Sequence, residues 1–184
     1  LDTANNNTAL GYLALSGDCG NQNTSLGSQS LVVATATDNT AVGYAAGNAI
    51  STGINNTILG SFAAVSATST DDCVIIGFAA GGGATLTGHD NVLIGRDAGH
   101  DLTSGEKNVF IGREAGDKND DGNESVVVGH QAGGANFGDG LTAVGFRAGQ
   151  GVTGVRNAMF GYQAGTTITS GTDCLFAGYQ AGLI

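Results

Sequence analysis

The chain has 184 residues with 33 Gly, no Pro and no Trp, and six Lys plus Arg against sixteen Asp plus Glu give it a formal net charge of −10. So few large side chains argue against a thick globular core, and the negative charge argues against nucleic acid as a partner, because phosphates would be repelled. No apolar run approaches the roughly 18 residues that a membrane span needs. Three cysteines, Cys19, Cys73 and Cys174, lack metal-ligand spacing and are interpreted as small apolar residues.

A five-residue pattern that ends in glycine recurs eleven times over the whole chain, at intervals of 16 to 18 residues. Asn39-Thr-Ala-Val-Gly43 is one copy. Such a period predicts stacked coils, and therefore a single all-β repeat domain over residues 1–184, a β-solenoid or parallel β-roll. The coils are centred on Gly11, Gly27, Gly43, Gly60, Gly77, Gly95, Gly112, Gly129, Gly145, Gly161 and Gly178.

Each glycine is preceded by a short predicted strand. The residue before the glycine is always apolar, and the residue two places earlier is mostly β-branched, so the two share one strand face, which we predict to be the core. The residue between them is also largely apolar, as at Ile58, Leu93 and Phe110. Apolar residues on both faces indicate burial on both faces, which one thin solenoid does not supply. We therefore expect oligomerisation along the stack.

A corner follows each glycine. Ala stands three residues later in ten copies, with Ser30 as the exception, and Gly follows it in eight. Small residues at a fixed place predict a close backbone approach or a positive φ. The segments 103–107 and 169–173 are typical of the outer loops, where the variation in repeat length is concentrated.

The copies Asn7-Thr-Ala-Leu-Gly11, Asn39-Thr-Ala-Val-Gly43 and Asn108-Val-Phe-Ile-Gly112 resemble the repeats of phage and bacterial surface fibre proteins. They are also similar to the head repeats of trimeric autotransporter adhesins. This resemblance implies three parallel chains, each a left-handed β-roll, in an extracellular homotrimer on a virion or a bacterial surface. Because the sequence begins at Leu1 without Met and stops inside a repeat at Ile184, we expect a fragment of a longer fibre.

One surface column is predicted directly after the signature glycines, and we call it the post-glycine column. Its aromatic and planar side chains suit sugar rings and anionic sugars, which makes it a candidate glycan-binding surface. Stacking of these side chains on one another between coils is the simpler interpretation. The candidate residues are Tyr12, Tyr44, Phe78, Arg96, Arg113, His130, Phe146, Tyr162 and Tyr179.

One outer loop, residues 117–124, matches the first half of a calcium loop, with oxygen side chains at alternate positions and a glycine. The candidate calcium ligands are Asp117, Asn119, Asp121 and Glu124. The twelfth-position Glu is absent, because Val128 stands there in a predicted strand. A solvated acidic turn is the alternative interpretation.

His89 with Asp90 and His100 with Asp101 could ligate a metal or form a catalytic dyad. However, the repeat places no Ser or Cys beside either pair, and turn-favouring Asp next to a chance His is the simpler interpretation. We predict no enzymatic activity.

The sequence favours a structural fibre segment that could also bind host-surface glycans. A polysaccharide-degrading fibre enzyme with a site between subunits is the main alternative. An ice-binding solenoid comes third, suggested by the threonines of segments 35–37 and 68–70, which we expect not to recur in other coils. We expect Ile94→Asp to dissociate or misfold the assembly.

Overall fold

The computed structural model describes residues 5–183, and it is all-β, with eleven three-residue strands in one parallel sheet. Each strand pairs in register with the strand of the next coil, so the sheet order equals the sequence order. The repeat architecture predicted from the glycine period is confirmed. The strands are β1 (Thr8–Leu10), β2 (Thr24–Leu26), β3 (Thr40–Val42), β4 (Thr57–Leu59), β5 (Val74–Ile76), β6 (Val92–Ile94), β7 (Val109–Ile111), β8 (Val126–Val128), β9 (Thr142–Val144), β10 (Ala158–Phe160) and β11 (Leu175–Ala177).

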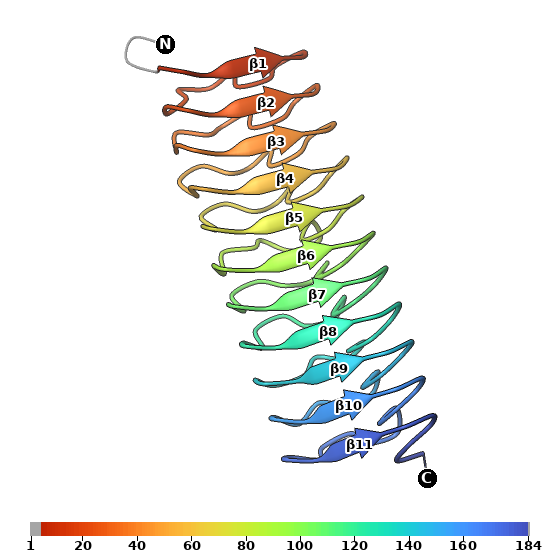
Figure 1. Ribbon diagram of the computed structural model, residues 1–184. Coiled ribbons are helices and arrows are strands. Elements are labelled where there is room, and N and C mark those ends of the chain that lie inside the picture. Colours follow the sequence, from red (N-terminus) through yellow and green to blue (C-terminus); the bar gives the residue numbers. More distant parts are fainter. Residues whose placement is uncertain (1–4, 184) are drawn as a thin grey trace.

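Figure 1 shows the coils stacked one on another in chain order, with β1 at one end of the stack and β11 at the other. We number each coil by its strand. At the usual strand spacing of roughly 4.8 Å, eleven coils make a rod about 50 Å long. Residues 5–183 contain no helix that could cross a lipid bilayer. Leu1 and Ile184, on which the expectation of a longer fibre depends, lie outside the described residues.

The signature glycines are required by backbone geometry. Gly60 has a φ of 138°, in a region that side-chain-bearing residues rarely occupy. A Cβ atom at Gly60 would also lie 2.5 Å from the carbonyl oxygen of Gly77, in the next coil. The chain turns its corner next, and small residues such as Ala63 and Ala80 are fully buried there. The corner predicted from glycine and alanine spacing is confirmed.

The core lies on the opposite strand face from the one predicted. The middle residue of each strand from β2 to β10 is fully buried, as Ile58, Leu93 and Phe110 are. The residues on either side of it face outward, and Leu59, for example, is 46% exposed. Alternation alone could not choose between two faces that are both apolar. The prediction that the residue before the glycine is core is therefore wrong.

A buried polar ladder, which we call the asparagine ladder, runs beside this core. Asn39 is typical: its Nδ2 donates to the Gly53 carbonyl oxygen at 2.8 Å, and its Oδ1 accepts from the Asn56 backbone N–H at 3.0 Å. The same pair of bonds recurs at each asparagine of the ladder, and it satisfies backbone groups that would otherwise be buried without partners. The ladder positions are Asn7, Asn23, Asn39, Asn56, Cys73, Asn91, Asn108, Ser125, Leu141, Asn157 and Cys174.

Candidate functional site

The most unusual surface is the outward face of the sheet, formed by the first and third residues of every strand. We call it the outer strip. On β5 to β8 it consists only of Val and Ile, and these residues are half-buried to exposed, with Ile111 at 37% and Val126 at 39%. On β1 to β4 the first residue is Thr instead. A continuous apolar surface of this kind marks an interaction site more often than a solvated face.

The post-glycine column lies along one edge of the outer strip. In its C-terminal part the rings of Phe146, Tyr162 and Tyr179 stack with centroid separations of 5.0 and 5.3 Å and interplanar angles of 23° and 13°. His130 contacts Phe146 edge to face. The column therefore stacks from coil to coil, as the simpler interpretation predicts.

The N-terminal part of the same column uses a residue that the sequence analysis missed. Tyr44 and Phe78 do not touch each other, because coil 4 carries Ser61 at the column position. Phe62, one residue further on, fills the gap and makes edge-to-face contacts with both, at 5.1 and 5.9 Å. The sequence did contain a signal for this contact: in coil 4 the aromatic residue stands two places after the glycine, not directly after it.

Arginines occupy the middle of the column. The guanidinium of Arg96 lies 5.6 Å from the Phe78 ring centroid and pairs with Asp97 at 3.0 Å. Arg113 pairs with Glu114 at 2.8 Å. Hydrogen bonds from Gln131 and then from Arg113 hold the pKa of Glu114 below its ordinary value. Both arginine side chains are more than half exposed, at 58% and 55%, so donors remain free for an external partner.

Stacking affects what the glycan candidates can do. A sugar ring binds to an open aromatic face, whereas the nearly parallel rings of Phe146, Tyr162 and Tyr179 turn their faces toward one another. Their edges and the phenolic hydroxyls remain for a ligand. Glycan binding by the post-glycine column stays a prediction.

The candidate calcium loop does not direct its oxygens to one point. Asn119 is fully buried and turned toward the core, where its Nδ2 donates to the Phe137 carbonyl oxygen at 2.8 Å. Its Oδ1 is buried without a hydrogen-bond partner. Asp121 is exposed, and hydrogen bonding to Asp120 raises the pKa of its carboxyl group. Glu124 is also exposed, at the opposite edge of the strip from the post-glycine column.

The fourth candidate ligand, Asp117, lines an open hollow of about 350 Å³ beside coils 6 and 7. Burial raises the pKa of Asp117. Within residues 5–183, no group of three or more His, Cys, Asp or Glu side chains is placed to hold a metal ion. The hollow is lined by Asp97, His100, Asp101, Glu114, Asp117 and Lys118.

The two candidate His–Asp pairs differ in the structure. His100 Nδ1 lies 2.7 Å from Asp101 Oδ1, as the sequence suggested. His89 pairs instead with Asp71 of the previous coil, whose backbone N–H donates to its Nδ1 at 3.0 Å. The Asp71 carboxylate Oδ2 lies 3.3 Å from the same nitrogen. Neither contact brings a nucleophile to the imidazole.

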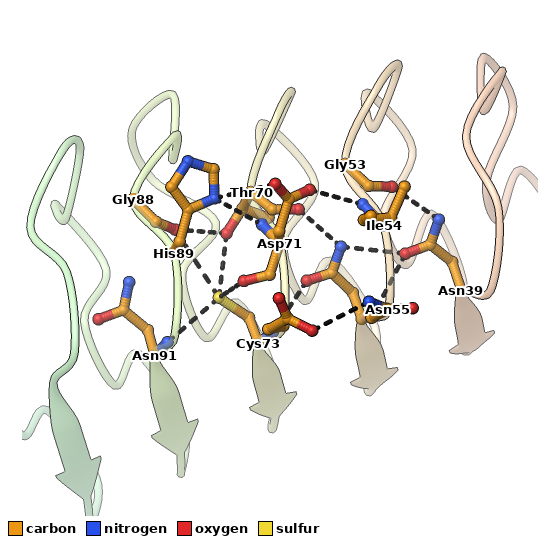
Figure 2. Close-up of polar contacts among 12 residues, drawn as sticks. Asn39, Gly53, Ile54, Asn55, Thr70, Asp71, Cys73, Gly88, His89 and Asn91 are labelled. Carbon is orange, nitrogen blue, oxygen red and sulfur yellow. Dashed lines mark hydrogen bonds and ion pairs between the residues drawn. The ribbon is translucent and has the colours of Figure 1, made fainter.

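Figure 2 shows the surroundings of Cys73, which stands at a ladder position between Asn56 and Asn91. Its Sγ accepts from the Asn91 backbone N–H at 3.3 Å and contacts the Thr70 hydroxyl at 3.0 Å. Burial raises the pKa of the Cys73 thiol. A protonated, enclosed thiol is a poor nucleophile, so Cys73 replaces asparagine as a structural member of the ladder.

A column of hydroxyls lies at the far corner of the coils. Thr35, Ser51, Thr87, Thr103 and Thr153 each donate to a backbone carbonyl of the following coil. The expectation that the threonines near residue 35 do not recur in other coils is therefore wrong, since unequal loop lengths hid the period.

Comparison of the chain with protein-family models, curated proteins and solved structures finds no match to any of them.

Proposed function

We propose that the chain is a structural segment of an extracellular fibre, from a virion tail or a bacterial surface, in which copies associate side by side through the outer strip into a homotrimer. The observation that carries this proposal is the partly exposed run of Val and Ile on β5 to β8. These residues complete no core within their own chain. A second apolar sheet face would cover them, as in sheet-on-sheet packing.

The inner half of the molecule also fits a structural role. Backbone hydrogen bonds between coils, the asparagine ladder and the filled interior join each coil to its neighbours. The number of three chains comes from the resemblance of the repeats to trimeric fibres. The post-glycine column would lie at the rim of such an assembly, where it could contact a host-surface glycan.

Small-angle X-ray scattering of the 184-residue chain tests the proposal. We expect a rod about 50 Å long with the cross-section of several solenoids, not of one. A cross-section that matches a single solenoid at every concentration would contradict association. A glycan array then separates a binding fibre from a plain shaft, and a fall in polysaccharide viscosity would reveal the degrading enzyme instead.

One observation favours ice binding as a second candidate function. Thr8, Thr24, Thr40 and Thr57 align in register on the outer strip. Among residues 5–183 their hydroxyls have no hydrogen-bond partner, so this end of the strip is a regular array of methyl and hydroxyl groups. Thermal hysteresis that disappears in Thr24→Lys would support this function, and its absence in the wild-type chain would exclude it.

A further inference from the structure

Charges of opposite sign flank the outer strip at the same level of the stack. We call the exposed residues two places before each strand the N edge; the post-glycine column, two places after each strand, is the opposite edge. In coils 5 to 8 the N edge carries Asp72, Asp90, Lys107 and Glu124. The post-glycine column carries Phe78, Arg96, Arg113 and His130 in the same coils.

These four coils are also the ones whose outer strip is wholly Val and Ile. In-register pairing of β5 to β8 keeps both edges aligned from coil to coil. The N edge sums to −2 here, from three acids and one Lys, and the post-glycine column sums to +2 with His neutral. An apolar centre between charged rims is the usual anatomy of a protein interface.

We propose that these two edges are the two halves of an intermolecular ion-pair seam, in which Arg96 and Arg113 of one chain face Asp72, Asp90 and Glu124 of the next. The inference rests on the proposed function, because the second copy is what covers the outer strip. The partner is fixed by charge complementarity: the chain itself carries the matching edge, at the matching height.

The seam determines the direction of the chains. When copies are related by rotation about the long axis, the post-glycine column of one lies beside the N edge of the next at the same level, and opposite charges meet. When the long axes are antiparallel and the strips face each other, post-glycine column meets post-glycine column, and the arginines oppose one another. Like charges in contact suppress wrong pairings, so the seam selects parallel chains.

The contacts within the chain leave the seam available. Asp97 and Glu114, which pair with Arg96 and Arg113, are the less exposed partners, and the arginines extend further into solvent. Of the N-edge acids, Asp72 accepts one bond from the Asn55 amide at 3.0 Å. Arg has five N–H donors, so an ion pair with the neighbouring acid still leaves donors for another chain.

Charge reversal on full-length chains tests the seam. The column variant combines Arg96→Asp with Arg113→Asp, the N-edge variant combines Asp72→Arg with Asp90→Arg, and the swapped variant contains all four changes. The N edge tolerates cations, because Lys107 and Arg156 stand at N-edge positions of coils 7 and 10, with φ values of 58° and 54°. Circular dichroism melting of each variant verifies the fold.

Native mass spectrometry supplies the outcomes. The swapped variant is labelled with heavy nitrogen, because its two Asp→Arg and two Arg→Asp changes cancel and leave its mass equal to that of wild type. We expect each edge variant to associate at least about tenfold more weakly than wild type, and the swapped variant to regain self-association. We also expect wild-type and swapped chains, when mixed, to sort into separate assemblies. Unchanged association in both edge variants would overturn the seam.

Tighter association of wild type with the column variant than with itself would also overturn the seam, because only antiparallel chains bring the two columns together. In both cases the proposed self-association would survive. A wild-type chain that stays monomeric would overturn the self-association and the seam together.

Discussion

The two faces of the same sheet have nearly the same composition but opposite surroundings. On the inner face Ile58, Leu93 and Phe110 are sealed by the opposite wall of their own coils. On the outer face the equally apolar Ile94 and Ile111 lie among the other residues of the outer strip and remain partly exposed to solvent. The inner face is therefore buried within one chain, whereas the outer face is left partly exposed. On the proposed function, the inner face determines the folding of the coil and the outer face determines the assembly of the fibre.

The largest expected effect comes from adjacent residues on β6. Leu93→Asp places an unpaired charge in the core and should unfold the chain, at a cost of about 4 kcal/mol or more. Ile94→Asp places the same charge on the outer strip and should leave a folded chain that no longer associates. Circular dichroism and light scattering of both variants provide the measurement. A folded Leu93→Asp chain, or an Ile94→Asp chain that still associates, would contradict the different roles assigned to the two faces.

The signature glycines belong to the complete, inner part of the molecule. Gly60→Ala combines a strained φ with a clash against the next coil, and should destabilise the chain by about 3 kcal/mol. Gly178→Ala is the matched control, because its φ is also positive but no atom lies within 4 Å of the added Cβ. Thermal unfolding should show the Gly60 variant to be at least about 1 kcal/mol less stable than the control. Equal losses would mean that stacking contributes nothing to the glycine requirement.

The asparagine ladder should have the next largest effect. Asn39→Leu leaves the Gly53 carbonyl and the Asn56 backbone N–H buried without their partners, a loss of about 2 to 4 kcal/mol. Asn48→Ala, which removes one half-buried bond to Gln29, should cost about 1 kcal/mol or less. Urea unfolding of the two variants compares them. While it is folded, the Asn39 variant should form an assembly of the same mass as wild type by light scattering, since the outer strip is unchanged.

The smallest effect is expected at Asp117, which lies outside both faces of the sheet. Because burial raises the pKa of this acid in the folded state, its charged form is disfavoured by folding. Asp117→Asn should therefore stabilise the chain at pH 7, by about 0.5 kcal/mol or less, since the half-exposed charge is screened by solvent. The gain should shrink as the pH falls through the folded-state pKa toward the ordinary value of Asp, because wild type then protonates. Melting curves between pH 3 and pH 7, about the range of carboxyl titration, would show it. A gain that is constant with pH would contradict this origin.

The sequence predicted the parts of the fold that depend on period. Glycine spacing was sufficient for the coils, the strands and the corners, because only glycine fits where backbone meets backbone at positive φ. The inward face was not predictable from alternation, since neighbouring residues such as Leu93 and Ile94 on β6 are both apolar and only Leu93 points inward. The recurring asparagine two residues before the middle strand position was a usable signal, because it shares that residue's face and is buried.

The candidate site was predicted less completely, for a different physical reason. The post-glycine column follows from one position per coil, and its stacked C-terminal rings were foreseeable. Phe62 and the pairing of His89 with Asp71 depend on contacts between neighbouring coils of unequal length. The calcium pattern specified oxygen atoms along the chain but not the direction of each side chain, and Asn119 turns inward.

The central claim is that the outer strip needs other copies of the chain to cover it. Light scattering coupled to gel filtration on the wild-type chain measures this directly. We predict a mass near three times the 18.1 kDa of one chain. A stable, folded species of 18.1 kDa over the whole concentration range would contradict the account.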